Sequence, residues 1–598
     1  MNLSLIFPPM VSPSCVPAGI AYLKSYIDRY AGWINVNLID LNLSLTNRLL
    51  GGYPENLTDI CAEAGINCPR RNSGCRFKNK LSPSEIAIFK QAKRIIKDKR
   101  LFLDEVIFEK YVIDCHHYLE EVNSCIVRIL RNRLENHLSG DGAAAEVILN
   151  EEITKIKSTM PEVVGFSLLL EGQIVYALAL AKIIKRKLGL PVVLGGPALF
   201  KYNLKEFMAA FDFVDFIVLK EGEESLPRLI KSIESNELES VPNLVWRKSG
   251  KITVNKIKCL DDLNRLPAPD FTGLELDEYF HPELILPIQS SRGCPWKRCK
   301  FCALNVQYDQ LYRQKDMERI VEEIRLLKEK YGARNFFFLD SEIPPYRLKR
   351  LSALLIDRRL KIFFAGYLRP AKGLDLAALK AAKRAGGRFF ILGVETLSDR
   401  GLGIIDKGTT LDSIRDVLRN ACQLKIGVLV YMMAGFPLQT VKELRQDLKK
   451  AVMLQKKYRV FSVIYSLYNM DVYQKFYEEL KDHGLKVKRK KPSFTCAEGL
   501  KVARTDLLHS SFRDNGARAY FTGGGYEGEF RLNQGRENFI RCINNFIFET
   551  QLIYCKHSGR RLRGARAIRR LNSFYGEKKA DAIFSAYAAA RSLGQEAS

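Results

Sequence analysis

The sequence lacks the features that mark membrane-spanning and exported proteins. None of its apolar runs approaches the roughly 20 residues that a transmembrane helix needs. The first ten residues, MNLSLIFPPM, contain neither a basic stretch nor a cleavage site for signal peptidase. We therefore expect a cytoplasmic protein with no membrane span. Low-complexity tracts are also lacking, and 47% of the 598 residues are hydrophobic, so we expect folded domains throughout.

Negative charge is scarce relative to positive charge. The chain has 67 acidic and 94 basic residues, which gives a net charge of +27. Such an excess attracts nucleic acid, acidic peptides or membrane surfaces, although a solvated basic face explains it equally well. The sequence shows no strands with alternating aromatic residues on which bases could stack. Nucleic acid is therefore a candidate partner that the sequence leaves unsupported.

Strand and helix patterns alternate in the first part of the chain. Residues 2–45 show the pattern strand, loop, helix and strand, and the alternation resumes at residue 161. Apolar strands joined by helices predict a parallel sheet that is covered on both faces. The fold class is therefore α/β, with a doubly wound, flavodoxin- or Rossmann-like domain at residues 1–250. Amphipathic helical patterns with few strand signals predict a helical insertion at residues 50–160.

A second block of alternating strands and helices follows an acidic, proline-containing linker at residues 251–283. It begins with a strand at residues 284–291 and a helix at residues 316–332, which Gly332 is placed to end. Five further strands follow, separated by helical stretches. This pattern predicts a partial (β/α)6 barrel at residues 284–480, whose site is built by loops at the carboxyl ends of the strands. The basic extension at residues 481–598 has no fold that the pattern indicates.

Fourteen cysteines are too few for a disulfide-stapled protein of this length, but they are clustered. Cys294, Cys299 and Cys302 stand in the segment SSRGCPWKRCKFCALN, on the loop that follows the strand at residues 284–291. Structural zinc usually takes four ligands in paired knuckles, and no second CxxC or pair of histidines lies at a suitable distance. An iron–sulfur cube needs only three cysteines if its fourth iron chelates a small molecule.

The spacing C-x4-C-x2-C, with an aromatic residue before the third cysteine, resembles the radical SAM superfamily. The commonest spacing of that superfamily, C-x3-C-x2-C, is one residue shorter. The resemblance implies that the three cysteines hold a [4Fe–4S] cluster whose fourth iron binds S-adenosylmethionine (SAM). It also implies an electron donor such as flavodoxin or ferredoxin.

The resemblance further implies contacts to SAM at the strand ends of the barrel. Phe301 would lie along the adenine, and the backbone of the segment with Asp340, Ser341 and Glu342 would bind the methionine amino group. Arg369 would pair with the carboxylate, and Glu395 would bind the ribose or the methionyl end. Gly435 would belong to the glycine-rich turn after the fifth strand. For Glu395 and Arg369, a helix cap or an ordinary ion pair is the alternative role.

Small residues close two strands of the first domain, at Ser167 and at Gly195–Gly196, and LKEGEES follows the next strand. This pattern is similar to a cobalamin-binding domain. Together with the barrel it resembles the B12-binding-domain radical SAM family, methyltransferase-like, over residues 1–480. Tight turns of a flavodoxin-like fold explain the glycines equally well. The cobalamin contacts implied are Pro8, Pro9, Ser167, Leu169, Gly195, Gly196 and Glu221.

The DxHxxG motif that supplies a histidine to cobalt in related domains is absent after the first strand, where FPPMVSPS stands. The stretch Asp114–His117 begins like that motif but lacks its glycine and has a helical pattern, so we interpret it as a solvated helix face. Cobalamin is then expected without a protein imidazole on cobalt. Cys61, Cys68 and Cys75 are equally spaced, and free cysteines are the preferred interpretation over a second metal site.

The resemblance implies an enzyme that cleaves SAM to a 5′-deoxyadenosyl radical and moves a methyl group from methylcobalamin to an unactivated carbon. The substrate would be a small molecule or a peptide. Two alternatives stay open: ring formation or rearrangement without methyl transfer, and the modification of RNA.

Overall fold

The computed structural model describes residues 1–51, 83–104, 143–235, 237–304, 311–434, 441–458 and 461–467. It also describes positions 436, 438 and 439 and isolated positions within 107–134 and 475–557. The described residues form two compact units. The first comprises Met1–Asp261 and Arg265–His281, and the second comprises Asp262–Asn264 and the residues from Pro282 onward. Within the described part of the chain, no helix is both long and apolar enough to cross a membrane.

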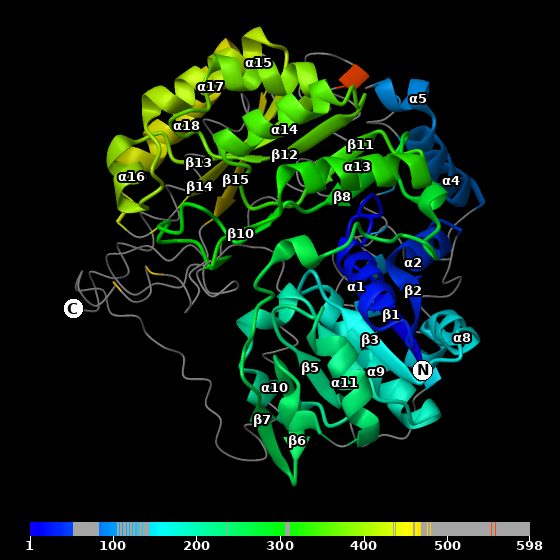
Figure 1. Ribbon diagram of the computed structural model, residues 1–598. Coiled ribbons are helices and arrows are strands. Elements are labelled where there is room, and N and C mark those ends of the chain that lie inside the picture. The colour runs from blue at the N-terminus through cyan, green and yellow to red at the C-terminus, as the bar shows by residue number, and fades with distance from the viewer. Residues whose placement is uncertain are drawn as a thin grey trace, which may run out of the picture. The chain divides into compact units, whose positions relative to one another are not determined.

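The first unit is built on a seven-stranded sheet with the order β2-β1-β3-β4-β5-β6-β7 (Figure 1). Its parallel strands are β1 (Asn2–Phe7), β2 (Asn35–Asp40), β3 (Val163–Ser167), β4 (Val192–Gly195) and β5 (Phe216–Val218). The order 2-1-3-4-5 is that of a flavodoxin-like, doubly wound sheet. Because the chain moves outward in opposite directions from β1, the switch point of the sheet lies between β1 and β3. The predicted fold class of this domain is confirmed.

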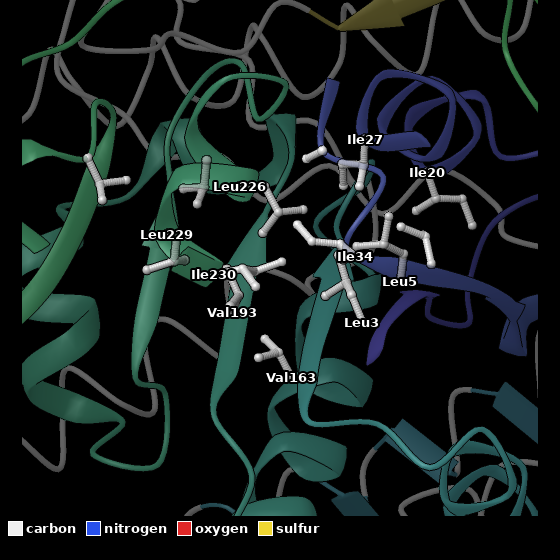
Figure 2. Packing of buried hydrophobic residues seen from close by; sticks show 14 of the residues in the cluster. Leu3, Leu5, Ile20, Ile27, Ile34, Val163, Val193, Leu226, Leu229 and Ile230 are labelled. Atoms are coloured by element: carbon white, nitrogen blue, oxygen red, sulfur yellow. The ribbon is translucent and has the colours of Figure 1, made fainter. Parts of the chain in front are cut away.

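The core of the first unit follows from the alternation of side chains along its strands. Leu3, Leu5 and Phe7 occupy alternate positions of β1 and therefore point to the same face of the sheet. Helices α1 (Ala18–Tyr30) and α11 (Ser225–Ser235) contribute Ile20, Ile27, Leu226, Leu229 and Ile230 to the same cluster, as Figure 2 shows. Helix α9 (Gln173–Leu188) is capped at its carboxyl end by Gly189, which has a left-handed backbone conformation (φ 66°). The backbone N–H of Gly189 donates to the carbonyl of Lys185.

The sequence pattern did not indicate the hairpin at the far edge of this sheet. Strands β6 (Leu244–Lys248) and β7 (Lys251–Val254) are antiparallel, and the two residues between them, Ser249 and Gly250, both have positive φ angles (47° and 79°). This is the backbone that a tight two-residue hairpin requires. The residues predicted as a linker therefore begin with a strand of the first sheet. They continue with the short helical turns η3 (Leu263–Arg265) and η4 (Leu276–Glu278).

The described part of the predicted insertion is helical. Helix α2 (Leu41–Leu50), whose first turn is capped by the side chain of Asp40, leads into it. The remaining helices are α4 (Pro83–Lys97), α5 (Lys99–Leu103), α7 (Ala143–Ile148) and α8 (Asn150–Ser158). Two short elements, η1 (Pro197–Lys201) and α10 (Leu204–Ala210), follow β4, and η2 (Leu238–Ser240) precedes β6.

The second unit contains a six-stranded parallel sheet with the order β15-β14-β13-β12-β11-β8. Its strands are β8 (Ile285–Ile288), β11 (Asn335–Phe338), β12 (Phe363–Leu368), β13 (Gly387–Glu395), β14 (Gly427–Ala434) and β15 (Phe461–Leu467). Helices α13 (Met317–Tyr331), α14 (Pro345–Asp357), α15 (Leu376–Ala385), α17 (Leu411–Gln423) and α18 (Val441–Lys457) connect them along one side of the sheet (Figure 1). The predicted partial (β/α)6 barrel is confirmed. Its strands are neighbours in chain order, so their carboxyl ends form one continuous edge.

Two small elements complete the described part of this unit. A short antiparallel pair, β9 (Ser291–Arg292) and β10 (Arg313–Gln314), brackets the cysteine loop, and α16 (Asp399–Ile404) follows β13. At the opposite, amino-terminal edge of the sheet, Glu283 accepts a hydrogen bond from Lys556 and interacts with His557. Residues far along the chain thus contribute to the end of the sheet that lies away from the cysteine loop.

Candidate active site

The cysteine loop starts at the carboxyl end of β8 and is attached there to the neighbouring strand. The Asp340 carboxylate, two residues after β11, accepts hydrogen bonds from the backbone N–H of Ser290 (3.1 Å), from the Ser290 hydroxyl (2.7 Å) and from the Ser291 hydroxyl. Burial raises the pKa of Asp340, although these hydrogen bonds act against the rise. The carboxylate therefore faces the base of the cysteine loop.

The three cysteines of the loop lie close enough for their charges to interact. Burial, opposed by the Lys407 ammonium and reinforced by the nearby thiols of Cys302 and Cys294, raises the pKa of Cys299 to about 12. Burial also raises the pKa of Cys302. Cys299 is 8% exposed, whereas the other two are half-buried. Three thiolates at this place need a positive partner, and bound iron would supply it by displacing the protons.

This donor set fits an iron–sulfur cube. Among the residues that the structure describes, no group of three or more His, Cys, Asp or Glu converges as the ligands of one metal ion would. In a cube each cysteine binds a different iron, so its three sulfur ligands need not meet at one point.

A buried ion pair stands beside the cysteines. Lys407 lies 3.0 Å from a carboxylate oxygen of Glu395, and both side chains are almost buried. Burial lowers the pKa of Lys407, but the charges of Glu395 and Cys299 outweigh this effect and raise it overall. The ammonium group also lies 5.2 Å from the centre of the Phe301 ring. Lys407 thus brings together two predicted site residues, Phe301 and Glu395, with the cysteines.

Backbone geometry supports this ion pair. Glu395 has a positive φ angle of 70°, which is uncommon for a residue with a side chain and is often found at functional sites. A Cβ atom at Gly393 would lie 2.9 Å from both the Glu395 carboxylate and the Lys407 ammonium. Position 393 therefore needs glycine for the pair to form as it does.

A second ion pair lies on the Cys294 side of the loop. Arg369 Nε is 3.0 Å from Glu342 Oε2, and the same oxygen is 3.9 Å from Cys294 Sγ. The other oxygen, Glu342 Oε1, is buried and has no hydrogen-bond partner in the described structure. An unused buried acceptor at this position suits a donor group of a ligand. Ser341, the preceding residue, is half-buried.

The sequence did not point to two of these residues, Lys407 and Trp296. Glu342 belongs to the segment FLDSE, which the resemblance placed at the methionine amino group without giving this side chain a role of its own. Lys407 lies in the stretch IIDKGTT, which resembles an ordinary surface segment. Trp296 lies inside the cysteine loop, where its ring is 4.6 Å from the Arg369 guanidinium. Lys407 and Arg369 reach the cysteine loop only through the packing of the strands, because both are distant from it in the sequence.

In the first unit, the loops on both sides of the switch point are joined by one side chain. The amide of Gln173 donates to the carbonyl of Pro8 (2.6 Å) after β1, and its oxygen accepts from the backbone N–H groups of Leu169 (2.7 Å) and Leu170 (3.0 Å) after β3. Pro8 and the adjacent Pro9 are buried, whereas Leu169 and Leu170 are 42% and 49% exposed. Exposed apolar side chains at a switch point suit a large, partly apolar ligand.

Small residues line the next part of the same edge. Gly196 has a φ angle of 103°, and a Cβ atom there would lie 2.4 Å from the carbonyl oxygen of Leu168. Gly195 ends β4, and Ser167 ends the neighbouring strand β3. Glu221 differs from these residues because its buried carboxylate accepts from the backbone N–H of Leu260 (2.6 Å). The edge thus collects the predicted cobalamin residues, whereas Glu221 is engaged within the unit.

Several predicted positions lie outside the described residues. They are Gly435, Asp114, His116, His117, Cys61, Cys68 and Cys75.

Comparison with known proteins shows which proteins these features resemble. Residues 288–451 match the model of the radical SAM superfamily. An uncharacterized methyltransferase of Pyrococcus horikoshii is 26% identical over 340 residues, which cover 54% of this chain and 71% of that protein. The anaerobic magnesium-protoporphyrin IX monomethyl ester cyclase of a Synechocystis species is 24% identical over 265 residues, 42% of this chain and 51% of the cyclase.

A solved structure is similar over both units. The radical SAM methyltransferase TsrM from Kitasatospora setae, solved with cobalamin and a [4Fe–4S] cluster bound, has a TM-score of 0.54 and is 14% identical. The match covers 96% of this chain and 99% of TsrM, and at this identity it describes the fold. These comparisons show a radical SAM domain at residues 288–451 and support a B12-binding radical SAM family for this chain.

Proposed function

We propose that this protein uses SAM and cobalamin to methylate an unactivated carbon of a small molecule or a peptide. The observation that carries the proposal is the cysteine loop with a buried ion pair on each side, at the carboxyl edge of the parallel sheet. Lys407 and Glu395 flank Cys299 and Cys302, and Arg369 and Glu342 flank Cys294. Two pairs of opposite charges suit a zwitterionic methionine moiety, which carries an ammonium and a carboxylate.

The residues that would hold each group follow from their chemistry. Cys294, Cys299 and Cys302 would hold the cluster, and Phe301 would lie along the adenine of SAM. The unpaired oxygen of Glu342 is an acceptor for the methionine ammonium. Arg369 is a donor for the methionine carboxylate, as the family resemblance implies, and its planar fork suits that group.

With both cofactors bound, reductive cleavage of SAM supplies a radical, and methylcobalamin supplies the methyl group. The protein contributes burial of the sulfur ligands, which keeps water away from them, and fixed charges that orient SAM. In the first unit, the loops after β1, β3 and β4 would hold cobalamin. The exposed Leu169 and Leu170 would cover part of its apolar surface. Reduced flavodoxin or ferredoxin would supply the electron.

Two other functions compete with methyl transfer. Ring formation is favoured by the similarity to a cyclase, as reported above. RNA modification is favoured by the net charge of +27 and by a putative methylthiotransferase of Methanocaldococcus jannaschii that is 23% identical over 236 residues. Binding of RNA would weaken steeply with salt, because each phosphate contact releases counterions.

The test uses a step that needs no knowledge of the substrate. The protein is reconstituted anaerobically with iron, sulfide and cobalamin, reduced with dithionite and given SAM carrying a deuterated methyl group. Deuterated methylcobalamin and S-adenosylhomocysteine support methyl transfer. Formation of 5′-deoxyadenosine alone supports the cyclase alternative and contradicts the proposal. A variant with alanine at Cys294, Cys299 and Cys302 serves as the control that retains cobalamin binding but forms no 5′-deoxyadenosine.

A further inference from the structure

The cysteine loop is one residue longer than the commonest spacing, and the backbone shows how the extra residue is accommodated. Between Cys294 and Cys299, Lys297 adopts a left-handed conformation with a φ angle of 58°. This conformation is uncommon for a residue other than glycine. The loop therefore bulges at Trp296 and Lys297, and something must hold the bulge in one arrangement.

The segment at residues 404–408, which begins at the last residue of α16, holds the bulge at three points. Trp296 Nε1 donates to the carbonyl oxygen of Asp406 at 2.7 Å. Arg298 Nε pairs with the Asp406 carboxylate at 3.0 Å. The backbone N–H of Lys300 donates to the carbonyl of Ile405 at 3.0 Å. These attachments lie on both sides of Cys299, so this segment, named here the 404–408 clamp, fixes the position of that cysteine.

The indole ring fits closely into the clamp. The guanidinium groups of Arg298 and Arg369 lie 5.1 Å and 4.6 Å from the ring centre. Gly408 lies against the ring, with a φ angle of 64°, and a Cβ atom at that position would lie 2.1 Å from a ring carbon. A side chain at position 408 is therefore incompatible with the present position of Trp296.

The same ring is connected to the other end of the loop. Arg369 donates to the carbonyl of Gly408 at 2.9 Å and also pairs with Glu342, whose carboxylate approaches Cys294 Sγ. We propose that Trp296, held against Gly408 by the 404–408 clamp, is a positioning residue that sets the separation of Cys294 and Cys299 in the longer loop. The proposal rests on the part of the proposed function that assigns a cluster to these cysteines.

The chain offers a matched pair of glycines for the test. Gly332 has a φ angle of 68°, and a Cβ atom there would have no neighbour within 4 Å. Gly332→Ala and Gly408→Ala therefore place a side chain at nearly the same positive φ angle, but only the second meets the indole ring. Iron and sulfide per chain, and the electron paramagnetic resonance spectrum of the reduced cluster with and without SAM, are compared after anaerobic reconstitution of the full chain.

We expect Gly332→Ala to match the wild type and Gly408→Ala to bind iron about tenfold more weakly, with an altered spectrum on adding SAM. Trp296→Ala removes the ring, so in that background Gly408→Ala should add no more than Gly332→Ala does. Equal behaviour of the two glycine variants, or an unchanged effect of Gly408→Ala without the ring, would overturn the proposal. If the wild type itself takes up no cluster, the proposed function fails instead, and this inference fails with it.

A second measurement needs no cluster. Trp296 is the only tryptophan after residue 246, so it can be observed alone when Trp33 and Trp246 are replaced by phenylalanine. In the apoprotein, Gly408→Ala should shift the Trp296 emission to longer wavelength, as the ring leaves its site, whereas Gly332→Ala should not. An unshifted emission in Gly408→Ala would contradict the clamp.

Discussion

Replacing Asp340 separates two roles for this residue, an anchor of the cysteine loop and a contact to SAM. As an anchor, Asp340 holds the end of β8 through three hydrogen bonds from Ser290 and Ser291, and it is 1% exposed. Asp340→Ala removes the acceptor for all three. The backbone N–H of Ser290 then loses its partner in a buried place, whereas the serine hydroxyls can rotate toward other acceptors.

The structure allows a magnitude for this change. Hydrogen bonds to a charged group contribute roughly 1.5–3 kcal/mol each, and a buried donor without a partner costs about 1–3 kcal/mol. Burial of the Asp340 carboxylate raises its pKa and costs free energy, which offsets part of the stability that the three hydrogen bonds contribute. We expect Asp340→Ala to lower the free energy of unfolding of the second unit by about 3 kcal/mol, which is roughly a hundredfold in the equilibrium constant.

The assay is urea denaturation of the apoprotein without SAM, followed by the fluorescence of Trp296 in the background that lacks Trp33 and Trp246. Because the chain has two units, the analysis applies to the transition that this reporter follows. Asp412→Asn is the control, since the Asp412 side chain is 87% exposed and pairs with the nearby Arg415 on the same helix. Such a surface change should stay within about 0.5 kcal/mol. If Asp340→Ala behaves like this control while the KM for SAM rises, the anchor reasoning is refuted and Asp340 is a ligand contact.

Three further predictions concern other parts of the described structure. Burial raises the pKa of Asp447 to about 6, so the stability that this group contributes to the wild type is lost as the pH rises from about 4 to 6. Thermal melting of Asp447→Asn should show no such loss. Parallel pH profiles of the melting temperature in the two proteins would contradict this prediction. Lys407→Met removes a buried positive charge beside the cysteines, so the reduction potential of the cluster should fall, whereas Lys407→Arg should keep the potential unchanged. The potential is measured by redox titration followed by electron paramagnetic resonance. An unchanged potential in Lys407→Met would contradict the prediction. Gly196→Ala should weaken cobalamin binding measured by optical titration, because its Cβ would meet the carbonyl of Leu168. Gly189→Ala, which also stands at a positive φ angle but has open space around its Cβ, should not weaken it. Equal binding in both variants would show that the turn at Gly196 does not shape the proposed cobalamin site.

The cluster ligands could be predicted from the sequence because they are local. Cys294, Cys299 and Cys302 stand within nine positions of one another, and their spacing already indicates a site that lacks a fourth protein ligand. The parallel strands of both sheets could be predicted for a similar reason, since apolar runs joined by helices allow few arrangements. The βα order and the position of the loop after the first barrel strand follow from these local patterns.

The partners of the cysteine loop could not be predicted, because they come from distant segments. Trp296 and Asp406 are 110 positions apart, and their hydrogen bond exists only because consecutive parallel strands place their carboxyl ends along one edge. The same alignment of strand ends brings Lys407 beside Cys299 and Asp340 within hydrogen-bonding distance of the serines of the loop. The sequence by itself determined which atoms can bind iron and which segments form strands. The tertiary structure decided which charges and which ring surround those atoms, because through-space contacts depend on how the strands pack and not on their spacing along the chain.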